Sequence, residues 1–204
     1  MHIQELRSQT PFEEVDYVFL KDQLKEYAQP RQKIRHWLKT KALLRVKKGI
    51  YVFGQNSIRG PYCLEHLANI IYGPSVISLE YALSFYGWIP ERVYEITSVT
   101  TGRNKIFDTP LGRFNYRHQK YQIFPYGITD IVIQDRHVLM ASPEKALLDL
   151  LYFSKPIFKN QHEFDTHLFE NLRIDEEQFE KSKYDLYELA KIYKHPHICF
   201  MVNA

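Results

Sequence analysis

The chain has little cysteine and none of the arrangements in which cysteine builds a site. Its two cysteines, Cys63 and Cys199, lie far apart in 204 residues and form no C-x-x-C pair, so we expect neither a zinc site nor a disulfide framework. No apolar run approaches the length of a membrane span, and the first residues lack the pattern of a secretion signal. We therefore expect a cytoplasmic protein with no membrane segment.

Common catalytic motifs are also missing. The sequence has no Gly-x-Ser-x-Gly turn, no glycine-rich phosphate loop and no Asp-x-Asp of a nucleotidyltransferase. His195 and His197 form the closest histidine pair, but no nearby motif supplies two further metal ligands. Glu144 and Lys145 are adjacent in an expected helix, which is the wrong spacing for a magnesium-dependent nuclease. We expect no catalytic residue, no cofactor and no metal.

Positive charge is concentrated in one part of the chain. The net charge is only +3, while hydrophobic residues make up 45% and aromatic residues 15%, as in a globular protein. Residues 21–60 hold eleven Lys and Arg against Asp22 and Glu26, a net charge of +9, so the remainder carries −6. Such a basic module is typical of proteins that contact nucleic-acid phosphates.

Residues 30–53 predict a basic helix followed by a basic hairpin. Pro30 suits the first helical position, and at 100° per residue Ile34, Trp37 and Leu38 share its side, while cationic and polar side chains fill the opposite arc. Two short β-branched and aromatic runs then flank a turn that contains Gly49. Helix, hairpin and charge together predict a winged helix-turn-helix that binds DNA.

The expected contacts divide along this stretch. Side chains near the N-terminal end of the exposed arc are predicted to read bases in the major groove: Arg31, Gln32, Arg35 and His36. Side chains late in the helix or on the hairpin are predicted to contact phosphate: Lys39, Lys41, Arg45, Lys47 and Lys48. Any one of these side chains could equally lie on the surface without contacting DNA.

The flanking sequence predicts an α+β fold in two domains. Thr10, Pro11 and Glu13 have the pattern of a helix start, and a second short helix is expected at 22–28. Turn residues at 54–57 and 60–61 suggest a boundary between a DNA-binding domain (1–57) and a second domain (61–204). There we expect helices at 61–72, at 78–87 and from Ser142, an antiparallel sheet within 93–141, and an acidic helical segment at 164–193.

The order of several motifs resembles the AbiEi family, the antitoxin and regulator half of type IV toxin–antitoxin pairs of abortive infection. The motifs are Lys47-Lys48-Gly49-Ile50-Tyr51, Ile77-Ser78-Leu79-Glu80-Tyr81-Ala82-Leu83, Gly87-Trp88-Ile89-Pro90-Glu91, Leu111-Gly112-Arg113-Phe114-Asn115-Tyr116 and Ser142-Pro143-Glu144-Lys145-Ala146-Leu147-Leu148-Asp149. The resemblance covers most of residues 10–155. It implies a repressor that binds inverted repeats in double-stranded DNA at its own promoter, with a functional link to a nucleotidyltransferase toxin.

Two other readings remain open at this point. The aromatic-rich second domain is also compatible with a protein-interaction module that lacks sequence-specific DNA binding. An enzyme acting on nucleic acid would have to use Glu144 or Asp149, but we expect Asp149 and Glu80 to pair with Lys145 or Arg103 in a structural network.

Overall fold

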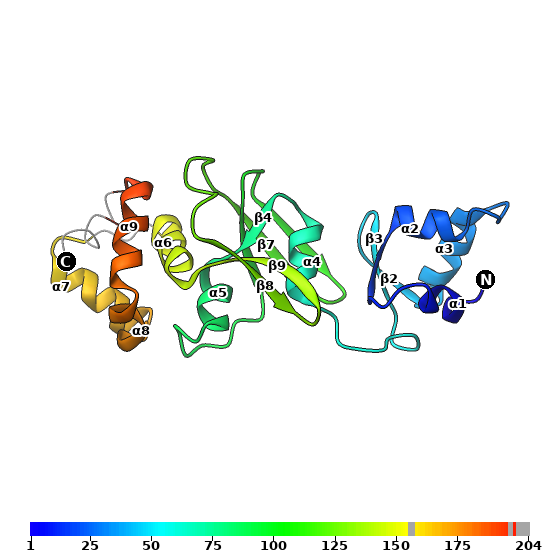
Figure 1. Ribbon diagram of the computed structural model, residues 1–204, viewed down its shortest axis with the longest axis horizontal. Helices are drawn as coiled ribbons and strands as arrows, with labels where there is room; N and C mark the ends of the chain where they lie inside the picture. The colour runs from blue at the N-terminus through cyan, green and yellow to red at the C-terminus, as the bar shows by residue number, and fades with distance from the viewer. Residues whose placement is uncertain (155–157, 196–197, 199–204) are drawn as a thin grey trace.

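The computed structural model describes residues 1–154, 158–195 and 198, so Cys199 and His197 lie outside the described residues. The chain has an α+β fold. A small N-terminal unit lies at one end, a six-stranded sheet with its helices occupies the middle, and a group of C-terminal helices lies at the other end (Figure 1). No helix among the described residues is long and apolar enough to cross a membrane.

The N-terminal unit combines three helices with a three-stranded antiparallel sheet of order β1-β3-β2. Its core contains Leu6, Leu20, Ile34, Trp37 and Phe53, all buried. Its elements, in chain order, are α1 (Ile3–Ser8), β1 (Glu14–Asp16), α2 (Tyr17–Gln23), α3 (Pro30–Lys39), β2 (Leu43–Lys47) and β3 (Ile50–Phe53).

The helix start predicted at Thr10 is wrong. The first helix is α1, which ends before Thr10, and residues 11–13 bend into β1. The Glu13 carboxylate does not return to the Thr10 backbone, because it accepts a hydrogen bond from the buried guanidinium of Arg7. The helix expected at 22–28 is also wrong in its bounds: α2 begins after Asp16, whose side chain accepts from the Phe19 N–H as an N-cap, and ends at Gln23.

The basic helix and hairpin form where they were predicted. Pro30 occupies the first turn of α3, where its missing N–H is not needed, and Ile34 and Trp37 face the core. The turn between β2 and β3 places Gly49 at a φ of +92°, a conformation that side chains rarely adopt. Gly54 follows β3, and a Cβ there would lie 1.8 Å from the Lys41 carbonyl oxygen, so the chain needs glycine at this close crossing.

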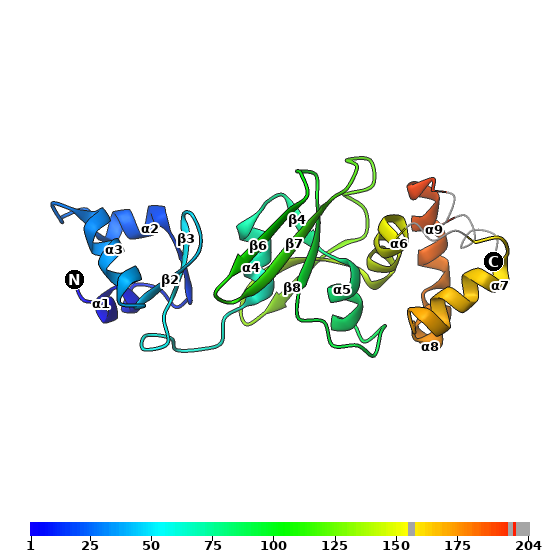
Figure 2. The ribbon, with the colours of Figure 1, turned by 180° about the vertical axis from the view of Figure 1, so that it is seen from behind.

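The hairpin is buried on both faces. Leu43, Tyr51 and Phe53 pack on the helices of the N-terminal unit, whereas Val46 and Val52 join the core of the following domain. The three-stranded sheet therefore lies between its own helices and the body of the molecule, as both views show (Figures 1 and 2). The predicted division at 57–61 stays a prediction, because apolar side chains of the hairpin contribute to the second core.

The second sheet is mixed, so the prediction of an antiparallel sheet is wrong. It has the order β6-β7-β5-β4-β9-β8, with β5 parallel to β7 and β4 parallel to β9. Strands β5 and β7 are parallel because β6 forms the edge of the sheet and β7, antiparallel to β6, lies between β6 and β5 (Figure 2). The six strands are β4 (Ser75–Ile77), β5 (Ile96–Thr100), β6 (Lys105–Thr109), β7 (Gly112–His118), β8 (Ile128–Ile133) and β9 (Arg136–Ala141).

Helices cover this sheet and extend beyond it. Those predicted near 61–72, at 78–87 and from Ser142 are present, and helices also occupy the acidic segment predicted to be helical at 164–193. Asp175 caps the helix that begins at Glu176, because its side chain accepts from the Gln178 N–H. The helices are α4 (Leu64–Ile71), α5 (Leu79–Phe85), α6 (Pro143–Ser154), α7 (Gln161–Thr166), the π-helical turn η1 (His167–Asn171), α8 (Glu176–Lys181) and α9 (Lys183–Tyr193).

Candidate nucleic-acid interface

The exposed face of α3 presents all four side chains that were predicted to read bases. Ile34 and Trp37 anchor the opposite face in the core, so the helix cannot rotate this arc away from solvent. One guanidinium has a partner within the unit, since Nε of Arg31 donates to the Tyr17 hydroxyl at 3.4 Å. The exposed side chains are Arg31, Gln32, Arg35 and His36.

The residues predicted to contact phosphate fall into two groups. Four are exposed and lie after the residues predicted to read bases, on the last turn of α3, the following loop or the hairpin: Lys39, Lys41, Arg45 and Lys48. Lys47 differs, because it is half-buried and its Nζ donates a hydrogen bond of 2.5 Å to the Ile71 carbonyl of α4. The same ammonium lies 5.6 Å from the centre of the Phe107 ring. We therefore remove Lys47 from the predicted phosphate contacts.

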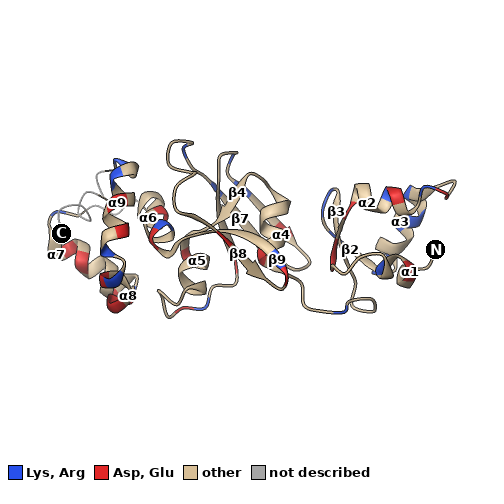
Figure 3. Cartoon of the chain, viewed as in Figure 1, with Lys and Arg blue, Asp and Glu red and all other residues tan. Residues whose placement is uncertain are grey.

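The basic side chains of residues 21–60 have no carboxylate partner within the described part of the chain. Elsewhere many cations are paired, for example Arg113 with Glu95 and Lys181 with Glu177. Lys and Arg lie along α3 and on the hairpin, while acidic residues are frequent on the C-terminal helices (Figure 3). The positive field of the N-terminal unit is therefore not neutralised internally, as phosphate binding requires.

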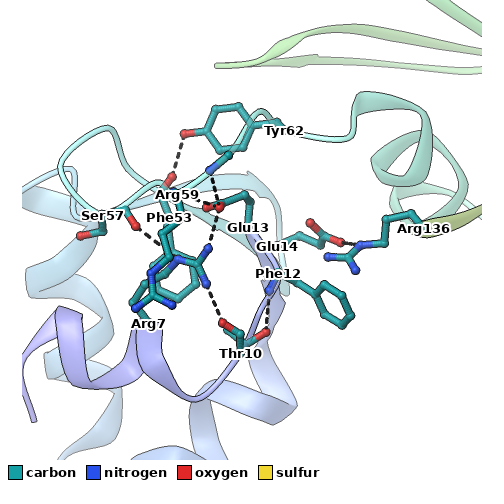
Figure 4. Close-up of polar contacts among 11 residues, drawn as sticks. Arg7, Thr10, Phe12, Glu13, Glu14, Phe53, Ser57, Arg59, Tyr62 and Arg136 are labelled. Carbon is teal, nitrogen blue, oxygen red and sulfur yellow. Dashed lines mark hydrogen bonds and ion pairs between the residues drawn. The ribbon is translucent and has the colours of Figure 1, made fainter. Parts of the chain in front are cut away.

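A buried arginine ties the N-terminal helix to the segment that leaves the hairpin. The guanidinium of Arg7 donates to the carbonyls of Thr10 and Ser57 and to Oε1 of Glu13, at 2.6 to 3.2 Å (Figure 4). The same Glu13 oxygen accepts the backbone N–H groups of residues 59 and 60, each at 3.0 Å. One carboxylate thus orients the exit of the N-terminal unit.

A second ion pair joins the two parts of the molecule. Arg136, at the start of β9, donates through Nε to the Glu14 carboxylate of β1 (Figure 4). The Arg136 side chain is buried, and the Glu14 side chain is only 10% exposed. The Arg136 guanidinium lies 3.1 Å from the centre of the Phe12 ring, and Nε2 of His66 faces Glu14 at 3.7 Å. This contact and that of Lys47 hold the sheet of the N-terminal unit against the following domain.

The second domain contains a buried polar cluster centred on Asp149. Asp149 of α6 accepts from Ser78, Gln119 and Tyr193, and pairs with Lys145 one turn earlier at 3.3 Å. Burial lowers the pKa of Lys145, against the effect of Asp149, and raises the pKa of Tyr193 well above its usual value. The expected pairing of Asp149 with Lys145 is confirmed, whereas Glu80 takes no part in this cluster.

Sequence reasoning missed the residues that orient the interface. Glu13 and Glu14 are adjacent in the chain, but their partners are distant: Gly60 lies 47 residues after Glu13 and Arg136 lies 122 residues after Glu14, so no local pattern announces these contacts. Among the described residues, no group of three or more histidine, cysteine or acidic side chains is placed to hold a metal ion.

Comparison with models of known protein families and with curated proteins finds no match for this chain. The resemblance to the AbiEi family therefore depends on the sequence motifs alone.

Proposed function

We propose that the chain is a DNA-binding transcriptional repressor whose N-terminal unit acts as a winged helix-turn-helix. The observation that carries this proposal is the exposed face of α3, on which Arg31, Gln32, Arg35 and His36 are free of carboxylate partners among the described residues. Long donors on an anchored helix suit the base edges of the major groove.

The topology of the unit supports the same proposal. Its order of helix, strand, two helices and a hairpin, with strands arranged β1-β3-β2, is compatible with a winged helix and supports the proposal. In such a unit the second of the paired helices, here α3, enters the major groove. The turn of the hairpin carries Lys48, exposed and suited to the adjacent phosphate backbone.

We further propose that the chain is an antitoxin of the AbiEi type that represses its own operon. Two of the family-like motifs meet in one place, because Ser78 and Lys145 both belong to the cluster around Asp149. In this proposal the residues of these two motifs stabilise the core of the second domain and have no catalytic role. We expect the adjacent reading frame to encode a nucleotidyltransferase. Co-expression of this chain should relieve the toxicity of that enzyme.

A titration on the DNA upstream of the chain's own gene tests DNA binding. The double variant Arg35→Ala with Lys48→Ala should bind at least about tenfold more weakly, because it loses one base contact and one phosphate contact. The matched control is Arg92→Ala with Lys159→Ala, which removes exposed cations outside the N-terminal unit and should leave affinity unchanged. Equal affinities of the test variant and the control variant would contradict the proposal.

A further inference from the structure

Arg31 alone among the four predicted base readers has a side-chain hydrogen bond within the described part of the chain. Its Nε donates to the hydroxyl of Tyr17 at 3.4 Å, although the arginine side chain is exposed. The side chains of Gln32, Arg35 and His36 make no hydrogen bond or ion pair to a described residue. Arg31 therefore has a preferred orientation before any ligand binds, which no such contact gives to the other three.

Tyr17 is a fixed support for this contact. It is the first residue of α2, directly after the N-cap Asp16, and its backbone N–H donates to the Gly49 carbonyl of the hairpin turn at 2.8 Å. Strand β1 pairs with β3 up to Asp16, so the start of α2 lies beside the hairpin (Figure 1). The half-buried ring of Tyr17 packs against the core of the N-terminal unit. A tyrosine side chain has only two torsions, so a ring held in this way gives the hydroxyl a defined position.

The position of Arg31 on α3 explains why its orientation matters. At about 100° per residue, Arg31 lies about 90° from the middle of the face that Ile34 and Trp37 bury. Gln32 lies almost opposite that face. Arg31 therefore projects from the border of the exposed arc, on the side where Tyr17 of α2 lies. An arginine side chain has large rotamer freedom, and the bond to Tyr17 restricts it.

We infer that Tyr17 is a positioning residue of the proposed DNA interface, and that it orients Arg31 towards a guanine base. The hydrogen bond occupies Nε of Arg31 and leaves Nη1 and Nη2 without an acceptor among the described residues. Those two nitrogens can donate side by side to O6 and N7 of guanine in the major groove. The inference rests on the proposed function and names the base that Arg31 contacts.

Two effects make the hydroxyl of Tyr17 favour sequence-specific binding. An arginine that is already oriented loses less rotamer freedom when it binds, so the guanine contact is stronger. A guanidinium held at its Nε is also less able to turn towards the phosphates, which every sequence offers. Tyr17 itself contacts no base, so its effect on DNA binding depends on the presence of Arg31.

The orientation of Arg31 can be measured without DNA. Nitrogen-15 relaxation of the arginine Nε–H groups should show Arg31 more ordered than Arg35, whose guanidinium has no partner among the described residues. Tyr17→Phe removes the hydroxyl and keeps the ring that packs on the core, so it should lower the order of Arg31 to that of Arg35. Tyr94→Phe, at an exposed tyrosine outside the N-terminal unit, is the matched control and should change neither. Equal order of Arg31 and Arg35 in the unsubstituted chain would overturn the inference.

A double-mutant cycle measures the effect on DNA binding. Tyr17→Phe should weaken binding to the duplex upstream of the chain's own gene about threefold to fivefold, and weaken binding to a scrambled duplex less. In the Arg31→Ala background the same substitution should have no further effect. A loss of equal size in both backgrounds would mean that the hydroxyl acts without Arg31, and no loss in either would mean that it has no role. Each of these two results would contradict the inference.

Replacement of single guanines by 7-deazaguanine, which lacks the N7 acceptor, identifies the contacted base. At one or more guanines the replacement should weaken binding of the unsubstituted chain at least about threefold and leave binding of Arg31→Ala unchanged. If no guanine behaves in this way, the assigned contact is wrong. A normal preference for the upstream duplex without coupling between Tyr17 and Arg31 would defeat this inference alone. Equal binding of the unsubstituted chain to the upstream and scrambled duplexes would instead defeat the proposed function, and this inference with it.

Discussion

Lys47 donates a hydrogen bond of 2.5 Å from its ammonium to the backbone carbonyl of Ile71, at the end of α4. Its neighbour Lys48 is exposed at the turn of the hairpin. Two adjacent lysines of one basic run thus have different roles: the first fastens the hairpin to the following domain, and the second remains available for phosphate.

This difference predicts different salt dependence of DNA binding. Lys48→Ala should lower the slope of log affinity against log salt by about one, because one phosphate contact is lost. Lys47→Ala should change that slope by less than half as much. Titrations of both variants at several salt concentrations measure the slopes, and equal losses would mean that Lys47 leaves Ile71 when DNA binds.

The pair between Arg136 and Glu14 should contribute strongly to stability. Arg136→Ala leaves the Glu14 carboxylate, which is only 10% exposed, without its main partner and should cost about 3 kcal/mol of unfolding free energy in urea. Arg173→Ala is the matched control, because its pair with Glu91 is largely exposed and should be worth less than about 1 kcal/mol. Similar costs for the two variants would contradict the account of the domain contact.

The cluster around Asp149 should behave as a buried structural network. Asp149→Ala leaves the Lys145 ammonium buried without its counter-charge, so we expect a loss of about 3–5 kcal/mol. The double variant Lys145→Met with Asp149→Leu removes both charges and should recover the part of that loss that comes from the unpaired ammonium, whereas Ser78, Gln119 and Tyr193 still lose their acceptor. Thermal or urea unfolding measures both variants, and a double variant no more stable than Asp149→Ala would argue against a purely structural cluster.

Buried tyrosines predict a loss of stability at alkaline pH. Burial raises the pKa of Tyr193 and of Tyr116 above the ordinary value of 10, so the folded state keeps phenol protons that the unfolded state releases. Their stabilising contribution is present below about pH 10 and falls as the pH rises above it. Unfolding free energies measured from about pH 8 to 11 should fall less steeply for Tyr193→Phe than for Tyr94→Phe, an exposed control.

The sequence predicts best where one segment determines its own structure. Pro30 at the start of α3, the spacing of Ile34 and Trp37, and the positive φ of Gly49 depend on neighbouring residues. Strand β3 is a continuous apolar run, a pattern typical of a strand that is buried on both faces. The pattern does not reveal which domain covers the second face.

Contacts between distant segments account for what the sequence could not predict. Thr10, Pro11 and Glu13 satisfy a local helix-start pattern, but Arg7 and the segment at 59–60 take the Glu13 carboxylate instead. The mixed sheet arises because β7 lies between β6 and β5, an order that no strand pattern specifies. Lys47 likewise has a partner that its own segment does not predict, a carbonyl of α4 that lies 24 residues away in the chain.

If α3 reads base sequence, as proposed, the chain binds its own upstream DNA more tightly than DNA of another sequence, and a comparison of the two affinities tests this. The measurement is the ratio of affinities for the chain's own upstream duplex and for a scrambled duplex of equal length, for the unsubstituted chain and for Arg35→Ala. We expect Arg35→Ala to lower that ratio by about tenfold, because a base contact is lost while most phosphate contacts remain. An unchanged ratio, or equal affinity of the unsubstituted chain for both duplexes, would contradict the account.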